Sequence, residues 1–212
     1  IESFHHLCLE VEQGEGRVVV ISGGAGIGKS RLLAEFQEHL QSQNWSVHHG
    51  AGYSYASAKP FALWISVLNS VFQIALEERA EARTRKVTDI IQHLLPDYVE
   101  MACLLNPLLA LNIPLSDVVN SISEETRRER FFDLVTALLQ ITSKDSPMAV
   151  IIEDLHWADT SSLELINHIG RNLSGRHLML CLTHRPKPDM PLNLPDDLTR
   201  TFALSELPQD TA

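Results

Sequence analysis

The stretch Arg17-Val18-Val19-Val20-Ile21-Ser22-Gly23-Gly24-Ala25-Gly26-Ile27-Gly28-Lys29-Ser30 decides the fold. Residues 17–22 form a run rich in β-branched side chains and bounded by glycines, which is typical of a strand buried on both faces. From Ser30 to Leu40 the apolar residues recur with helical spacing. The glycine-rich segment between them matches G-x-x-x-x-G-K-[ST] at every fixed position. This strand–loop–helix arrangement predicts a site for the phosphates of a nucleoside triphosphate.

Each part of the motif has a physical role in binding phosphate. The glycines let the backbone curl so that successive N–H groups point at phosphate oxygens, and the following helix adds its positive N-terminal end. Lys29 supplies a positive charge for the β- and γ-phosphates, and Ser30 offers a hydroxyl to Mg²⁺. We expect the nucleotide to be held by Gly23, Gly24, Ala25, Gly26, Ile27, Gly28, Lys29, Ser30 and Arg31.

Composition and charge exclude several classes of protein. The 212 residues are 44% hydrophobic and 21% charged, as is usual for a globular chain with a packed core. Acidic side chains outnumber basic ones by 27 to 17, and the net charge of −10 argues against a protein that coats nucleic acid or an anionic membrane. No apolar run approaches the roughly 18 residues of a membrane helix. Three widely spaced cysteines, in no metal-binding pattern, favour a reduced, cytoplasmic setting: Cys8, Cys103 and Cys181.

Strands and helices alternate along the rest of the chain. Further strands are expected at 45–50, 148–153, 177–183 and 201–204. Helices are expected at 61–76, at 77–95, from Ser121 with Glu124 completing a capping box, and at 160–173 with Asp159 or Ser161 as the cap. Prolines at 107 and 114 suggest that residues 97–115 are irregular. The alternation predicts an α/β fold in which helices cover both faces of a parallel sheet.

The spacing of these elements also suggests how the chain is organised. We expect one domain over residues 1–212, with a core at 17–52 and 146–208 and a large helical insertion at about 53–145. Because the chain begins at Ile1 rather than Met, we expect it to be a fragment of a larger multidomain protein.

The apolar strand expected at 148–153 ends in two successive carboxylates, Glu153 and Asp154. Such groups lie at the ligand edge of a parallel sheet, so we expect Glu153 to reach Mg²⁺ through a bound water. Asp154 is expected to orient or deprotonate an attacking water. Just beyond the pair, we expect Trp157 to anchor the turn by packing. His156 is expected either to brace the turn through a hydrogen bond or to take part in proton transfer near the γ-phosphate.

A second strand ends in polar residues that can reach the same edge. Thr183 can contact the γ-phosphate or the attacking water. Arg185 can either reach the phosphate and sense its terminal group or form a surface ion pair. We therefore place Asp154, Glu153, Thr183 and Arg185 in the catalytic group, with Ser30 and Glu153 as the ligands of Mg²⁺.

The string Ile152-Glu153-Asp154-Leu155-His156-Trp157-Ala158-Asp159, followed by Ser161-Ser162-Leu163-Glu164-Leu165, resembles the ED-x-HWAD-x-SS-L signature of the AAA-type P-loop ATPase module of STAND proteins, the signal-transduction ATPases with numerous domains. Residues 26–33 and 182–186 are similar to the same family, and the resemblance covers about residues 17–208. It implies an ASCE-type five-stranded sheet of order 5-1-4-3-2 and a place in a multidomain regulator. Residues 131–134 and the insertion look most like the group linked to adenylate/guanylate cyclases, and LuxR-type regulators are the other kind of parent.

Motif and resemblance together suggest an ATP-binding regulatory module that hydrolyses ATP slowly with Mg²⁺ and switches between ATP and ADP states. Most P-loop ATPases place Asp before Glu at the acidic pair, and the reversed order here leaves the division of roles between Glu153 and Asp154 open. No cyclase activity is expected from this chain, and the absence of an N-K-x-D motif favours ATP over GTP. Two other functions would also use the phosphate loop. One is a small-molecule kinase, with its acceptor pocket in the insertion, and the other is a nucleotide-binding scaffold without turnover.

We expect the partners to be the nucleotide and other domains of the parent chain, without direct binding of nucleic acid or membrane. A homo-oligomer is also possible on this sequence, and in it Arg127, Arg128 or Arg130 would serve a neighbouring subunit as an arginine finger. Alternatively, the charged residues at 124–130 form a solvent-exposed helix face, with ion pairs such as Glu124–Arg128.

Overall fold

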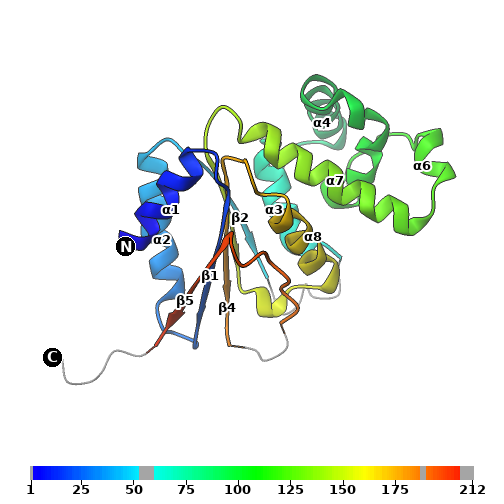
Figure 1. Cartoon of the computed structure of the whole chain (residues 1–212). Coiled ribbons are helices and arrows are strands. Elements are labelled where there is room, and N and C mark those ends of the chain that lie inside the picture. Colours follow the sequence, from blue (N-terminus) through cyan, green and yellow to red (C-terminus); the bar gives the residue numbers. More distant parts are fainter. Residues whose placement is uncertain (1, 53–59, 187–189, 206–212) are drawn as a thin grey trace, which may run out of the picture.

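The computed structural model describes residues 2–52, 60–186 and 190–205, and within them one five-stranded sheet forms the centre of the molecule (Figure 1). All neighbouring strands are parallel, and their order is β2-β3-β4-β1-β5. The strands are β1 (Arg17–Gly23), β2 (Ser46–Ala51), β3 (Met148–Glu153), β4 (Leu178–His184) and β5 (Thr199–Leu204). The predicted α/β class, the strands and the order 5-1-4-3-2 are therefore confirmed.

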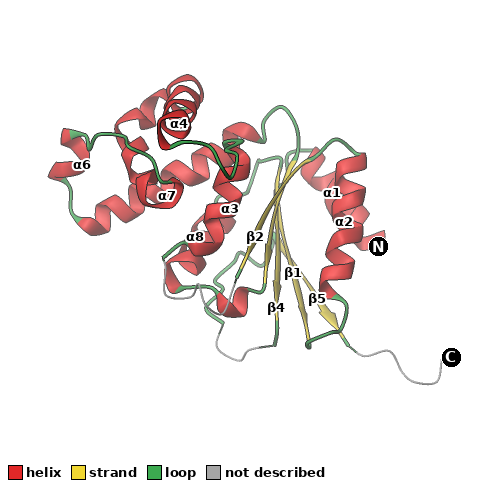
Figure 2. Ribbon diagram, turned by 180° about the vertical axis from the view of Figure 1, so that it is seen from behind, coloured by secondary structure: helices red, strands yellow, loops and turns green. Residues whose placement is uncertain are grey.

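Helices cover both faces of this sheet (Figures 1 and 2). One face carries α1 (Glu2–Glu12) and α2 (Lys29–Ser42), and the other carries α3 (Ala62–Val71), α7 (Glu124–Thr142) and α8 (Thr160–Arg171). Alternate residues of a strand serve the two sides: in β1, Val19 and Ile21 pack in the core under α1 and α2, whereas Val18 and Val20 belong to the opposite core. This double burial explains why the central strands β1, β3 and β4 are continuous apolar runs, whereas the edge strands β2 and β5 are partly exposed.

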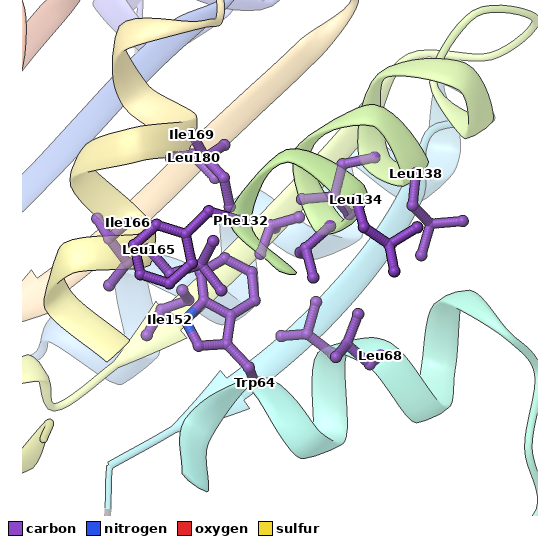
Figure 3. Packing of buried hydrophobic residues seen from close by; sticks show 14 of the residues in the cluster. Trp64, Leu68, Phe132, Leu134, Leu138, Ile152, Leu165, Ile166, Ile169 and Leu180 are labelled. Atoms are coloured by element: carbon purple, nitrogen blue, oxygen red, sulfur yellow. The ribbon is translucent and has the colours of Figure 1, made fainter. Parts of the chain in front are cut away.

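The larger core lies between the sheet and α3, α7 and α8. Figure 3 shows side chains from all of them converging, among them Trp64, Phe132, Ile152, Leu165 and Leu180. Trp64 is fully buried, and its indole N–H donates to the carbonyl oxygen of Ser162 at 3.3 Å, which ties α3 to α8. None of the helices in the described ranges combines the length and apolar character needed to cross a membrane.

Helix α1 is the one long element that the sequence analysis did not predict. Its inner face packs on β1 and α2, and the Phe4 ring stacks on Phe36 with their centroids 3.6 Å apart. Near the C-terminal end of α1, the guanidinium of Arg17 forms ion pairs with Glu10 of this helix at 2.7 Å and with Glu15 at 2.6 Å. Burial raises the pKa of the Cys8 thiol in this helix to about 12. Cys8, Cys103 and Cys181 are all free and buried, as expected of small core residues.

The segment between β2 and β3 is helical, and α4 and α6 lie beyond α7, away from the sheet (Figure 1). Besides α3 and α7 it holds α4 (Ala80–Leu94), the 3₁₀ helix η1 (Pro96–Leu105), α5 (Asn106–Leu109) and α6 (Asp117–Ser121). The expected helix at 61–76 ends at Val71, because the backbone of Gln73 turns left-handed at φ 53°. The division into core and insertion stays a prediction, and residues 53–59 and 206–212 lie outside the described ranges.

The expected start of α7 is wrong by two residues. Ser121 ends α6, and its hydroxyl donates to the carbonyl oxygen of Val118 at 2.9 Å. Ile122 is extended, so the chain turns before the long helix can begin. The true cap is Ser123, whose Oγ accepts from the backbone N–H of Thr126 at 3.2 Å. The capping box of Ser121 and Glu124 therefore does not form.

This correction gives a matched pair of stability variants. Ser123→Ala leaves an N-terminal N–H of α7 without its side-chain acceptor, and we expect it to lower the free energy of unfolding by about 1 kcal/mol. Ser121→Ala removes only an exposed bond near the end of α6 and should cost clearly less. Urea unfolding followed by circular dichroism measures both. A larger loss for Ser121→Ala would contradict the observed cap.

Candidate functional site

The glycine-rich loop lies where β1 ends and α2 begins, at the carboxyl edge of the sheet. Gly26 and Gly28 have φ of 73° and 102°, in the left-handed region where side chains are disfavoured, so the loop needs glycine at both positions. A cavity of about 300 Å³ opens beside it. Its wall is formed by Ala25, Gly26, Gly28, Lys29, Ser30, Arg31, Asp154 and Arg185. Gly23, Gly24 and Ile27, also expected in the nucleotide site, are not part of this wall.

Lys29 is buried at the first position of α2, with 9% of its surface exposed. Its Nζ donates to the carbonyl oxygens of Gly23 at 2.8 Å and Gly24 at 2.7 Å. An ammonium group has three donors, so these bonds fix its direction and leave capacity for a phosphate oxygen. The charge is thus held at the wall of the cavity by the loop itself.

The loop meets the end of β3 through a second contact. Ser30 Oγ donates to Glu153 Oε2 at 2.9 Å, although the two residues are 123 positions apart in the chain. A hydroxyl and a carboxylate oxygen at this separation are hard ligands of the kind that Mg²⁺ prefers. The residues present therefore fit the expected magnesium pair, Ser30 and Glu153.

Asp154 lies on a sharp turn just after β3. Its backbone is left-handed, with φ 56° and ψ 44°, a conformation that Asp tolerates better than most residues. Its backbone N–H donates to Thr183 Oγ1 at 3.2 Å, which links the ends of β3 and β4. The Asp154 side chain is half exposed and lines the cavity, whereas Thr183 is 1% exposed and is not in the wall. Thr183 therefore holds the turn that carries Asp154, a contact that the sequence analysis did not identify.

The turn continues into η2 (Leu155–Trp157), where the imidazole of His156 is 10% exposed. Its Nδ1 lies 3.8 Å from Asp154 Oδ1, and neither ring nitrogen has a hydrogen-bond partner among the described residues. Burial lowers the pKa of His156, and this outweighs the opposite effect of the Asp154 carboxylate. The expected hydrogen-bonded brace is thus not formed. Trp157 was expected to anchor the turn by packing; it is 40% exposed, and its ring centroid lies 5.2 Å from that of His156.

The candidate arginines fall into two groups. Arg185 lines the cavity beside the glycine-rich loop, which we call the phosphate cavity, and its role in sensing phosphate stays a prediction. The others lie on α7: Arg127 donates to the carbonyl oxygen of Val119 at 2.8 Å, and Arg128 pairs with Glu164 of α8 at 3.0 Å. The expected pair of Arg128 with Glu124 is therefore replaced by a contact between helices. Arg130 lies 3.6 Å from Asp133, and the arginine-finger role stays a prediction.

A larger cavity of about 700 Å³ lies between α7, α5, η1 and the start of α3, and it is mainly apolar. Phe61, Leu104, Leu108 and Phe131 are in its wall. It shares no lining residue with the phosphate cavity. The Leu-rich stretch of residues 104–111 is thus partly core and partly the wall of this cavity.

Comparison with known proteins assigns a family to this arrangement. The family model described as AAA ATPase domain matches residues 1–181. An uncharacterised protein of Rhizobium meliloti (strain 1021), R02095, is 26% identical over 186 residues, which are 82% of this chain and 16% of that protein. This chain thus spans about a sixth of the length of the curated relative that it matches.

Two solved structures have weaker similarity. The KaiC-like protein PH0186 of Pyrococcus horikoshii OT3 is 14% identical, with a TM-score of 0.38, over 92% of this chain and 76% of that one. A chain in the structure of Drosophila ORC bound to DNA is 10% identical, with a TM-score of 0.45, over 98% and 93%.

Proposed function

We propose that this chain, which belongs to the AAA ATPase domain family, binds ATP with Mg²⁺, hydrolyses it slowly and acts as a nucleotide-dependent switch. The observation that carries the proposal is the bond between Ser30 Oγ and Glu153 Oε2 at 2.9 Å. It joins the phosphate loop to the acidic end of β3, so that the groups for binding and for hydrolysis meet at one cavity. A site that bound the nucleotide without hydrolysis could use Glu153 for Mg²⁺ but would not need the Asp154 carboxylate at the cavity wall.

The roles of the residues follow from their positions. The loop N–H groups and Lys29 hold the triphosphate, and Ser30 and Glu153 hold Mg²⁺. Bound Mg²⁺ supplies positive charge to the phosphate oxygens. Asp154 faces the cavity and accepts a hydrogen bond from the attacking water, while Thr183 holds the backbone of Asp154 in place. Arg185, which follows the neighbouring strand β4 and also lines the cavity, contacts the terminal phosphate and distinguishes ATP from ADP.

The regulatory part of the proposal is thermodynamic. ATP and ADP differ at the terminal phosphate, which Lys29 and Arg185 contact, so the two ligands favour different arrangements of the cavity wall. The strength of the switch is limited by that difference in affinity. We further propose a STAND-type module in a cyclase-linked or LuxR-type parent, whose other domains receive the signal. The resemblance at residues 152–165 and the much greater length of the curated relative support this.

A small-molecule kinase is the alternative that the structure supports less well. Such an enzyme needs an acceptor pocket that opens onto the γ-phosphate. The 700 Å³ cavity in the helical segment shares no wall with the phosphate cavity, and Asp154 is placed to orient water. Phosphate release that requires an added acceptor would favour the kinase.

Removal of the Glu153 carboxylate tests the magnesium assignment. Glu153→Gln retains the shape but loses the anionic ligand, so we expect the Mg²⁺ concentration for half-maximal ATP hydrolysis to rise about tenfold or more. Nucleotide binding in EDTA should change little, because the loop and Lys29 are intact. Glu38→Gln, an exposed substitution in α2 outside the cavity wall, is the matched control. An unchanged magnesium requirement in Glu153→Gln would contradict the assignment.

A further inference from the structure

The imidazole of His156 is the buried polar group near the site that the proposed mechanism has not used. Nine-tenths of the side chain is buried, and both ring nitrogens lack a hydrogen-bond partner within the described ranges. A buried polar atom without a partner is destabilising, so such an arrangement calls for an explanation. The ring is held by packing, with its centroid 5.2 Å from that of Trp157.

The position of the ring relative to the cavity limits what it can do. Asp154 lines the phosphate cavity but His156 does not, so the imidazole approaches the Asp154 carboxylate from outside the cavity. The distance from Nδ1 to Asp154 Oδ1 is 3.8 Å, beyond a hydrogen bond by less than about 1 Å. The positive side chains around it are Lys29 of α2 and Arg185 beyond β4, with His184 at the end of β4. Burial first, and these neighbours after it, lower the pKa of His156, which favours the neutral imidazole.

A neutral imidazole carries one N–H, and in the tautomer with that proton on Nδ1 the donor lies 3.8 Å from Asp154 Oδ1. A small shift of the Asp154 side chain would pair Nδ1 with Oδ1, and Nε2 would stay an acceptor without a partner among the described residues. The bond would occupy Oδ1 and leave Oδ2 as the acceptor for the attacking water. The free carboxylate is otherwise half exposed and has several rotamers open to it.

We propose that His156 is a positioning residue, which donates from Nδ1 to Asp154 Oδ1 when ATP occupies the cavity and thereby fixes the carboxylate that orients water. The inference rests on the proposed function, because it assigns His156 a role through Asp154. The ring itself does not touch the nucleotide. It adds no affinity for ATP and acts on turnover alone.

Three substitutions of His156 separate this role from simple packing. The amide nitrogen of His156→Asn lies near the place of Nδ1, whereas that of His156→Gln reaches the place of Nε2, and His156→Leu has no donor. We expect His156→Leu to lower kcat about tenfold or more with KM and ATP affinity changed less than about twofold. His156→Asn should recover most of kcat, and His156→Gln should not. His177→Leu, which removes an imidazole just before β4 at the opposite edge of the sheet, should leave kcat unchanged.

A double substitution tests the dependence on Asp154. If His156 acts through that carboxylate, His156→Leu should have no further effect in an Asp154→Asn background. If His156→Leu lowers kcat by the same factor in the unmodified chain and in Asp154→Asn, the proposal is overturned. Equal losses in the Asn, Gln and Leu variants accompanied by weaker ATP binding would overturn it too, because they indicate a structural role.

The proposed function can fail separately. If the unmodified chain releases no phosphate from ATP, the hydrolytic assignment fails and the role of His156 fails with it. If the unmodified chain turns over and His156→Leu does so at the same rate, the role of His156 alone is overturned.

Discussion

Replacement of Lys29 by alanine is expected to weaken ATP binding by about a hundredfold or more. Lys29 brings a buried positive charge to the cavity wall, and charge-assisted bonds to two phosphates at about 1.5 kcal/mol each amount to roughly this factor. The fold should survive, because the ammonium bonds only loop carbonyls and no carboxylate among the described residues. Calorimetric titration with ATP and ADP measures the loss.

The matched control for this variant is Lys86→Ala, which removes a lysine paired with Glu78 in the helical segment. It has the same change of net charge and should bind ATP as the unmodified chain does. Equal binding by Lys29→Ala and Lys86→Ala would show that the phosphates are held elsewhere.

Replacement of Asp154 by asparagine should separate hydrolysis from binding. We expect kcat to fall by about 10²- to 10³-fold, in the range of a lost general base, with ATP affinity nearly unchanged. Asparagine has the same shape and also tolerates the left-handed backbone at φ 56°, so the turn and its bond to Thr183 should persist. Single-turnover phosphate release, together with equilibrium binding, measures both quantities.

A comparison of Asp154→Asn with Glu153→Gln tests which carboxylate of the acidic pair orients water and which binds Mg²⁺. If Asp154→Asn retains turnover while Glu153→Gln loses it at saturating Mg²⁺, the two carboxylates have exchanged the roles assigned here. The bond between Ser30 and Glu153 argues against that exchange, because it directs Glu153 to the expected metal ligand.

The three central strands β1, β3 and β4 were predictable because they are buried on both faces. Each of them, such as residues 148–153, is then a short continuous apolar run, and this local signal does not depend on the neighbours. Helix α1 has a signal too, since Phe4, Leu7, Cys8 and Val11 are buried at helical spacing.

Prolines account for a second error in the helical segment. Pro107 was expected to mark irregular structure, yet it lies in the first turn of α5; Pro96 follows the end of α4 at Leu94 and itself begins η1. Proline suits that position because its missing N–H would be unbonded there in any case. A proline alone cannot show whether a helix ends before it or begins with it.

The candidate site was predictable only in part. A contiguous motif gives the phosphate loop, and the strand-end rule gives Glu153 and Asp154. The bond from Asp154 to Thr183 and the burial of His156 depend on how β3, β4 and the turn pack against one another. No spacing in the sequence encodes these contacts, so the structure was needed to find them.

The most direct test of the central claim is phosphate release from ATP by the unmodified chain, measured with and without Mg²⁺ and with no added acceptor. The account predicts slow release that requires Mg²⁺ and continues over several turnovers. Tight binding of ATP with no release in the presence of Mg²⁺ would contradict it, and would mean that this cavity holds the nucleotide without hydrolysing it.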